Sequence, residues 1–222
     1  MSIEATAIPE PIGVFGGTFD PVHFGHLRAA LEIYEELQPA EVRLIPCRVP
    51  AHRASPSVSG DHRLALLRLA VEGVPGLCVD DRELRRPGPS YMVDTLASLR
   101  EERPEAPLWL IVGMDSFLGL PGWHRWLALF ELAHVVVMSR PGYAPTPPPA
   151  LAEQVERRRV AEPEPLRRTP AGAVYFHAVT PLDISATRIR ALIAAGRAPR
   201  FLLPETVWQR IAQQGWYGWN KG

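Results

Sequence analysis

Residues 16–27 read Gly-Gly-Thr-Phe-Asp-Pro-Val-His-Phe-Gly-His-Leu and join a short apolar run to the first long helical pattern. The apolar run, residues 12–15, has the length of a buried parallel strand, and apolar side chains recur at helical spacing from residue 24 to residue 37. A strand, a loop and a helix therefore follow one another. In open α/β sheets, ligands bind at the carboxyl ends of the strands, and a helix start offers unpaired N–H groups to an anion. The stretch predicts a phosphate-binding loop.

Two features of this loop suit a phosphate chain. Gly16 and Gly17 lack a Cβ, so a bulky ligand can lie against the backbone. His23 and His26 are three residues apart and share one face of a helical first turn. Two imidazoles beside donor-rich backbone can hold a phosphate chain without a lysine. The alternative is an ordinary tight turn followed by solvated histidines that cap the helix.

Length and charge narrow the class of protein. The chain of 222 residues is long enough for one good core, and we expect residues 1–222 to form a single domain. Hydrophobic residues make up 46% of the chain and charged residues 22%, as is typical of globular proteins. Basic and acidic residues both number 24, so the formal net charge is zero. This balance argues against a general nucleic-acid or membrane-surface binder, because such proteins depend on a basic field.

The use of lysine and cysteine excludes further classes. Lys221 is the only lysine, so there is no P-loop or Schiff-base lysine, and arginine must supply any cationic phosphate contact. Cys47 and Cys78 form neither a metal-like cluster nor a dense disulfide framework. We expect residues 1–11 to be a flexible tail, and they lack the pattern of a secretory leader. Since no apolar run reaches about 18 residues, we expect a cytoplasmic protein without a membrane span.

The remaining apolar runs complete a predicted α/β fold. They cover residues 42–45, 77–79, 108–112, 135–138 and 174–178. We expect a Rossmann-like, open, mostly parallel sheet with helices on both faces, the strand order 3-2-1-4-5 and an extra sixth strand. In this order the fourth strand lies beside the first, and the crevice between them is the topological switch point.

Gly113 and Asp115 follow the fourth predicted strand and would face the first loop across this crevice. Asp115 can accept hydrogen bonds from ribose hydroxyls, and Gly113 permits close approach. In the alternative interpretation, Asp115 only caps the following helix.

Two further loops lie at neighbouring strand ends. The loop after the second strand is rich in proline and ends in His52 and Arg53, which suits either a ligand contact or a solvated connection. We expect Asp61 to cap the next helix. Residues 81–96 form a charged loop broken by Pro-Gly-Pro and lead into a helix that we expect to start at Ser90; a solvated connection is again the alternative.

A second anion-binding candidate is residues 183–190, which read Asp-Ile-Ser-Ala-Thr-Arg-Ile-Arg. Ser185 is a good N-cap, but Arg188 stands where glutamate or glutamine would complete a capping box. Positive charge in a first turn opposes the helix dipole, and an external anion would resolve the conflict. An arginine-rich surface helix is the alternative. Arg188 and Arg190 point in different directions, so we expect different roles for them.

The rest of the chain carries weaker signals. Residues 144–171 shift to proline and charge, and we interpret them as an exposed, mobile excursion around a short helix. From Pro204 onward we expect a terminal helix. We expect the aromatic side chains that follow, those of Trp216, Tyr217 and Trp219, to pack rather than bind.

Five segments, in matching order between residue 12 and about residue 210, resemble the H-x-G-H nucleotidyltransferase superfamily. The closest similarity is to its nicotinate-nucleotide adenylyltransferase branch. Residues 16–27 and 183–190 carry most of it, and residues 83–96 resemble the family loop near the nicotinate end. Met92 stands where the family usually has threonine, so a hydroxyl contact is lost there while a backbone N–H contact would survive.

The resemblance implies a role for each candidate residue. It implies catalytic roles for His23 and His26, and for Arg190 a contact with phosphate. It implies that ATP binds at Gly16, Gly17, Thr18, Phe19, Gly113, Asp115, Ser185, Thr187 and Arg190. It implies that the second substrate binds at His52, Arg53, Tyr91, Met92, Trp123 and His124, with Trp123 stacked on the pyridine ring.

The implied reaction transfers the AMP moiety of ATP to nicotinate mononucleotide, giving nicotinate adenine dinucleotide and pyrophosphate in NAD biosynthesis. We expect Mg²⁺ to arrive on the ATP phosphates, since no carboxylate cluster presents a cage. The alternatives are a related adenylyltransferase for nicotinamide mononucleotide or phosphopantetheine, and a nucleotide-sensing module without turnover. A dinucleotide-dependent oxidoreductase is disfavoured, because the glycine loop lacks G-x-G-x-x-G. The sequence leaves open whether the protein is a monomer or a homo-oligomer.

Overall fold

The computed structural model describes residues 9–50, 55–139 and 145–220. Within these ranges six strands form one sheet in the order β3-β2-β1-β4-β5-β6, and all neighbouring pairs are parallel. The strands are β1 (Ile12–Gly17), β2 (Glu41–Pro46), β3 (Leu77–Val79), β4 (Leu108–Gly113), β5 (His134–Ser139) and β6 (Val174–Ala178). The predicted fold class and strand order are confirmed.

β1 lies at the centre of the sheet. It pairs with β2 along its whole length, from Ile12 opposite Glu41 to Gly17 opposite Pro46. On its other side β1 pairs with β4, where Ile12 lies opposite Leu108. The chain winds outward from β1 to β3 and then returns to β4, so the topological switch point lies between β1 and β4 as predicted.

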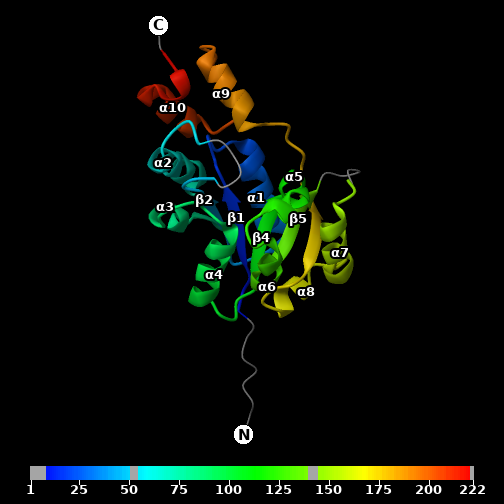
Figure 1. Cartoon of the computed structure of the whole chain (residues 1–222). Helices are drawn as coiled ribbons and strands as arrows, with labels where there is room; N and C mark the ends of the chain where they lie inside the picture. Colours follow the sequence, from blue (N-terminus) through cyan, green and yellow to red (C-terminus); the bar gives the residue numbers. More distant parts are fainter. Residues whose placement is uncertain (1–8, 51–54, 140–144, 221–222) are drawn as a thin grey trace.

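Helices cover both faces of this sheet and extend beyond its upper end in Figure 1. They are α1 (Phe24–Leu37), α2 (Gly60–Val71), α3 (Arg82–Arg85), α4 (Met92–Glu102), α5 (Met114–Leu118), α6 (Leu129–Leu132), α7 (Pro149–Arg158), α8 (Pro165–Arg168), α9 (Ala186–Ala194) and α10 (Glu205–Gln214). Short 3-10 turns cover η1 (Leu120–Gly122), η2 (Trp126–Ala128) and η3 (Trp216–Gly218). None of the helices within the described ranges is both long and apolar enough to cross a membrane.

Successive side chains of the central strands point alternately to the two faces of the sheet, and this divides the core into two clusters. Phe15 and Leu44 belong to the cluster that contains residues of α1, α2, α9 and α10. Their neighbours Val14 and Ile45 belong to the cluster that contains residues of α4, α5, α6 and α7. Successive strand residues point to opposite faces, so both faces of the sheet are buried, as a parallel sheet requires.

Two helix starts differ from the prediction. α2 begins after Ser59, whose hydroxyl accepts a hydrogen bond from the N–H of His62, so Asp61 lies in the first turn rather than at the cap. α4 begins at Met92 rather than Ser90. The Ser90 hydroxyl instead accepts a hydrogen bond from the backbone N–H of Arg48, in the loop after β2. A tertiary hydrogen bond therefore replaces the local cap that we expected.

Residues 145–171 are mostly exposed, as expected, but the segment also contacts the core. They form two helices, α7 and α8, rather than one, and Leu151 and Leu166 are fully buried. The carbonyl of Leu166 also accepts a hydrogen bond from Nε1 of the buried Trp109. Two buried leucines therefore anchor this largely exposed segment to the core, and the expectation of a single short helix is wrong.

The N-terminal tail is only partly described. Residues 1–8 of the expected flexible tail lie outside the described residues. Pro11 is buried, and its carbonyl accepts a hydrogen bond from the N–H of Ala40 just before β2. The tail that we expected to reach residue 11 therefore ends earlier.

Candidate active site

The ends of the neighbouring strands β1 and β4, together with the residues that follow them, carry six of the nine predicted ATP contacts. β1 ends at Gly17 and β4 ends at Gly113. α1 starts a few residues after β1, at Phe24, whereas α5 starts directly after β4, at Met114. Two helix starts therefore lie at the edge of the sheet where an open α/β fold binds its ligand.

Gly16 and Gly17 make room for side chains of the chain itself. A Cβ on Gly16 would lie 2.3 Å from Cε of Met92, and one on Gly17 would lie 2.9 Å from the ring of Phe19. Both glycines are part of β1, and neither has a positive φ. The space that we assigned to a ligand is thus filled by Met92 and Phe19, and a nucleotide has access only to the remaining backbone of these glycines.

Phe19 is a packing residue. Its side chain is 1% exposed, and its ring meets those of Phe15 and His26 edge-on, with centroids 6.0 and 5.0 Å away. The prediction that Phe19 binds ATP is therefore wrong for the side chain, which leaves only the backbone for such a contact. The ring instead packs edge-on against His26.

His23 and His26 stack on each other at the start of α1. Their ring centroids are 3.7 Å apart, and the ring planes differ by 26°. His23 occupies the N-cap position, but its side chain makes no capping hydrogen bond and is only 5% exposed. The alternative of solvated capping histidines is therefore wrong for His23. Its Nδ1 has no hydrogen-bond partner among the described residues, although buried polar atoms are normally satisfied.

The surroundings of Gly25 explain why the H-x-G-H pattern has a glycine at its third position. A Cβ at this position would lie 3.0 Å from Nδ1 of His23 and 3.5 Å from the carbonyl oxygen of Ile184. The absence of a side chain lets the imidazole and residue 184 approach the first turn of α1. The two predicted anion-binding segments are therefore adjacent, although about 160 residues separate them in sequence.

Burial lowers the pKa of His23 from 6.5 to about 4. Between these two values the unfolded chain binds a proton that the folded protein does not, so the free energy of unfolding falls as the pH decreases. From pH 7 to pH 4.5, we expect the wild type to lose about 2 to 3 kcal/mol more stability than His23→Asn. Urea unfolding at both pH values measures this difference. Parallel pH dependences for the two proteins would contradict it; the buried His134 is present in both and cancels.

Gly113 and Asp115 lie open at the start of α5. A Cβ on Gly113 would meet no atom within 4 Å, and Asp115 is exposed. The N-cap position of α5 is Gly113, without a side-chain capping bond, and Asp115 lies in the first turn. The alternative that Asp115 only caps this helix is therefore wrong, and its carboxylate is accessible to a ligand.

The residues predicted to bind the second substrate gather at the start of α4. Tyr91 and His124 lie with ring centroids 4.4 Å apart, at a tilt of 34°. Met92 is the first residue of α4 and lies over Gly16, as described above. Trp123 is partly buried against the core next to His124. His52 and Arg53 lie outside the described residues.

Ser185, Thr187 and Arg190 come together at the start of α9. Ser185 is the N-cap and accepts a hydrogen bond from the N–H of Arg188 at 3.3 Å, which confirms the predicted cap. Nη2 of Arg190 donates to the Thr187 hydroxyl at 3.3 Å, and its Nη1 donates to the backbone carbonyl of Asp20 at 2.6 Å. Arg190 therefore reaches the loop that carries His23.

Asp20 is a site residue that sequence analysis missed. Its side chain is 6% exposed, and its carboxylate accepts hydrogen bonds from the N–H of Ser57 at 2.8 Å and from the Tyr217 hydroxyl at 2.9 Å. Oδ2 of Asp20 also lies 3.7 Å from Nη1 of Arg190. The sequence signal that could have found Asp20 is an acidic residue among the apolar side chains of residues 19–22. Nothing in the sequence pointed to Tyr217.

Arg63 is a second residue that the sequence did not reveal. It is fully buried, and its guanidinium donates to the carbonyl oxygens of Thr18 and Cys47, both at 2.6 Å. The thiol of Cys47 in turn lies 3.8 Å from the Thr18 hydroxyl. Arg63 therefore ties the loop after β1 to the loop after β2 and fixes their spacing.

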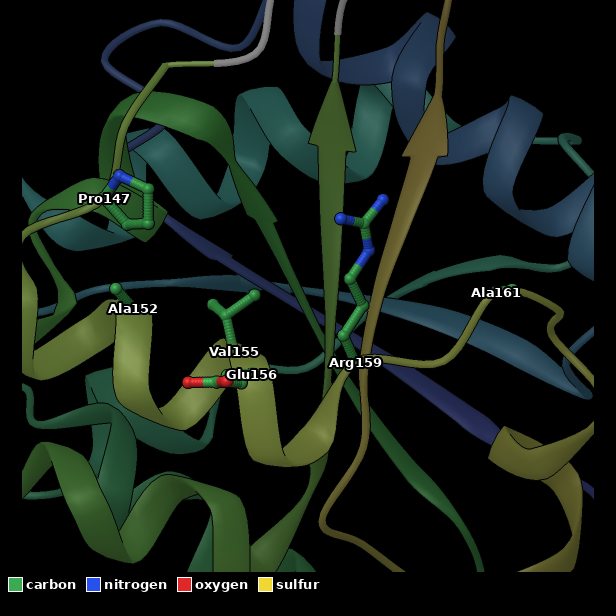
Figure 2. Close-up of a pocket in the computed structure, with 6 residues that line it drawn as sticks. All are labelled: Pro147, Ala152, Val155, Glu156, Arg159 and Ala161. Carbon is green, nitrogen blue, oxygen red and sulfur yellow. The ribbon is translucent and has the colours of Figure 1, made fainter.

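A pocket of about 600 Å³ lies elsewhere, beside α7. It is lined by Pro147, Ala152, Val155, Glu156, Arg159 and Ala161. Figure 2 shows the Arg159 side chain extending from the end of the helix over the neighbouring strands, and its guanidinium lies 5.2 Å from the centre of the Phe176 ring. The residues predicted to bind ATP or its acceptor are not among the six, so this pocket is separate from the candidate site.

Known proteins are similar to this chain over most of its length. The model of the cytidylyltransferase-like family matches residues 14–192. The chain is 58% identical over 208 residues to a "Probable nicotinate-nucleotide adenylyltransferase" of Halorhodospira halophila, covering 94% of this chain and 95% of the relative. The chain belongs to the nicotinate-nucleotide adenylyltransferase family. An Aeromonas salmonicida protein of the same name is 50% identical over 207 residues, or 93% of this chain and 97% of its own length.

Solved structures share the fold of this nicotinate-nucleotide adenylyltransferase family member. The Plasmodium falciparum nicotinic acid mononucleotide adenylyltransferase complexed with NaAD superposes with a TM-score of 0.72 at 14% identity, covering 95% of this chain and 98% of the other. Its complex with APC gives a TM-score of 0.71 at 15% identity, with the same coverage. At such low identity the likeness concerns the fold alone.

The described residues do not gather into a cage for a metal ion. In the parts of the chain that the structure describes, no three histidine, cysteine, aspartate or glutamate side chains gather closely enough to hold a metal ion. Both carboxylate oxygens of Asp20 already accept hydrogen bonds from Ser57 and Tyr217. The described donor set therefore does not form a protein cage for Mg²⁺, and we assign no residue as a metal ligand.

Proposed function

We propose that the protein transfers the AMP moiety of ATP to nicotinate mononucleotide, forming nicotinate adenine dinucleotide and pyrophosphate. A phosphate oxygen of the mononucleotide attacks the α-phosphorus of ATP, and the bond from this phosphorus to the bridging oxygen breaks. The attacking phosphate is already anionic at neutral pH, so no side-chain nucleophile or strong base is needed. Catalysis is therefore a matter of positioning and electrostatics.

The observation that carries the proposal is the contact between the two helix starts. Arg190 of α9 donates to the carbonyl of Asp20, three residues before His23 at the start of α1. One end of a triphosphate can then meet the imidazoles while the other meets the guanidinium and the N–H groups of α9. Since its pKa is about 4, His23 is neutral at pH 7 and offers hydrogen bonds rather than charge. Arg190 supplies the positive charge.

The acceptor end is assigned to the start of α4. Tyr91 occupies the N-cap position of α4 without a side-chain capping bond, and its carbonyl accepts from the N–H groups of Asp94 and Thr95. This leaves the N–H groups of Met92 and Val93, at the very start of the helix, for an external partner. A pyridine carboxylate suits these groups, and the paired rings of Tyr91 and His124 offer flat faces to a heterocycle. The acid form of the pyridine nucleotide is therefore the substrate that these residues favour over the amide.

Mg²⁺ enters this proposal only as the partner of ATP. When bound to the phosphate oxygens it neutralises part of their negative charge. The residues of this chain then have to bind and orient the two substrates and exclude water from the site. The pair of histidines and Arg190 would do this for the triphosphate.

The proposal is tested by the release of pyrophosphate from ATP and Mg²⁺ with three acceptors in parallel. We expect nicotinate mononucleotide to react at least about tenfold faster than nicotinamide mononucleotide or phosphopantetheine, because only the first carries the carboxylate. Faster reaction with either of the others would reassign the acceptor. Binding of ATP without pyrophosphate release in any of the three mixtures would indicate a nucleotide-sensing module instead.

A further inference from the structure

The C-terminal turn η3 returns the chain to the first loop. Tyr217 lies in this turn, 197 residues from Asp20, and donates its hydroxyl hydrogen to Oδ1 of Asp20 at 2.9 Å. The backbone of Tyr217 has φ 60 and ψ 24, between Gly215 and Gly218, which also have positive φ. A tyrosine is disfavoured in this backbone conformation and adopts it only where the surrounding contacts hold it there. The turn is therefore shaped to bring the hydroxyl to Asp20.

The Asp20 carboxylate is satisfied by donors other than Arg190. Oδ1 accepts from Tyr217, and Oδ2 accepts from the N–H of Ser57 at 2.8 Å. Arg190 makes its short contact of 2.6 Å with the backbone carbonyl of Asp20, whereas Nη1 lies 3.7 Å from Oδ2. The guanidinium is thus held beside the carboxylate without forming a close ion pair with it.

This arrangement leaves Arg190 available to an anion. A carboxylate and a guanidinium with free donors and acceptors normally form a two-pronged pair, and such a pair would compete with phosphate for the same N–H groups. Burial, with the charge of Asp20 as a further cause, raises the pKa of Tyr217 far above its usual value. The hydroxyl therefore stays protonated and donates to Asp20 throughout the neutral pH range.

We propose that Tyr217 and Asp20 position Arg190 for the ATP triphosphate, with Tyr217 occupying the carboxylate that would otherwise pair with the guanidinium. This inference rests on the proposed function, in which Arg190 contacts the phosphates. Tyr217 and Asp20 are positioning residues, because they act on the nucleotide through Arg190. A residue of the C-terminal turn thereby sets the affinity for ATP.

The test measures KM for ATP, KM for nicotinate mononucleotide and kcat in Tyr217→Phe, Asp20→Asn and the double variant. Tyr217→Phe removes only the hydroxyl, and we expect it to raise KM for ATP about three- to tenfold, with kcat and the acceptor KM within about twofold of wild type. In the Asp20→Asn background the competing charge is absent, so the same change should alter KM for ATP by less than about twofold.

Trp219→Phe is the matched control. Trp219 belongs to the same C-terminal segment and packs against Trp208, with ring centroids 4.7 Å apart. We expect this substitution to lower Tm while KM for ATP stays within about twofold of wild type. All kinetic measurements are made well below the Tm of each variant. Should Tyr217→Phe not fold, Asp20→Asn alone carries the test: without the competing carboxylate charge, KM for ATP should stay at or below about the wild-type value, and a rise of more than about threefold would contradict the inference.

Three results would overturn the inference: an unchanged KM for ATP in folded Tyr217→Phe, equal effects of this change in both backgrounds, or the same rise in Trp219→Phe. A failure of the proposed function gives a different pattern. In that case the wild type releases no pyrophosphate, or Arg190→Gln leaves KM for ATP unchanged. The two failures are therefore distinguishable within one set of assays.

Discussion

His26→Ala is expected to lower kcat by about 100-fold or more while KM for ATP changes by less than about threefold. His26 stacks on His23 at 3.7 Å and is supported edge-on by Phe19 at 5.0 Å, so its ring is held in place before the reaction. A donor fixed in this way acts mainly on the charge that develops during transfer of the AMP moiety. Steady-state kinetics with varied ATP, together with equilibrium binding of ATP, measure both quantities.

Two variants control for this result. His26→Gln keeps an N–H donor of similar reach and should recover part of the lost kcat. His177 is a buried histidine whose Nε2 lies 3.0 Å from Oε2 of Glu36, and His177→Gln should leave kcat within about twofold of wild type. Equal losses in kcat and in ATP affinity for His26→Ala would show that the imidazole contributes only to ground-state binding.

Arg190→Gln should raise KM for ATP by about 10- to 100-fold and leave the acceptor KM within about threefold. The guanidinium is 30% exposed and is held by the carbonyl of Asp20 and the hydroxyl of Thr187. Its charge and its remaining N–H groups are therefore held in a fixed, partly exposed position. Arg190→Lys keeps the charge but loses the planar fork, so we expect an intermediate KM.

Arg188→Gln is the matched control for Arg190. Both arginines lie in the first turns of α9, but the Arg188 side chain is exposed. Within the described parts of the chain, Arg188 contributes only its backbone N–H, which donates to the capping hydroxyl of Ser185. We expect KM for ATP in Arg188→Gln to stay within about threefold of wild type. A larger effect at Arg188 than at Arg190 would reverse the assignment of the phosphate contact.

Local patterns predicted the fold but not all of the helix ends. The apolar strands and the helical spacing after residue 24 depend on near neighbours in sequence, and the strand order follows from the rules for parallel sheets. The predicted cap at Asp61 and the predicted helix start at Ser90 were wrong, because Ser59 is a competing cap and Ser90 bonds to Arg48 in another loop. Such competition cannot be resolved from propensity alone.

The order of the strands followed from the general rules for parallel sheets. The two candidate anion-binding segments and the pair of histidines could be read from the sequence, because each depends on residues a few positions apart. The network of Asp20, Tyr217 and Arg190 could not, and neither could the buried Arg63. Their partners are up to 197 residues distant, and only the packing of α9, α2 and the C-terminal turn around the loop after β1 brings them within hydrogen-bond range. The periodicity of apolar residues indicates which face of a helix or strand is buried. A hydrogen bond between distant segments depends instead on where the helices and strands pack in the tertiary structure.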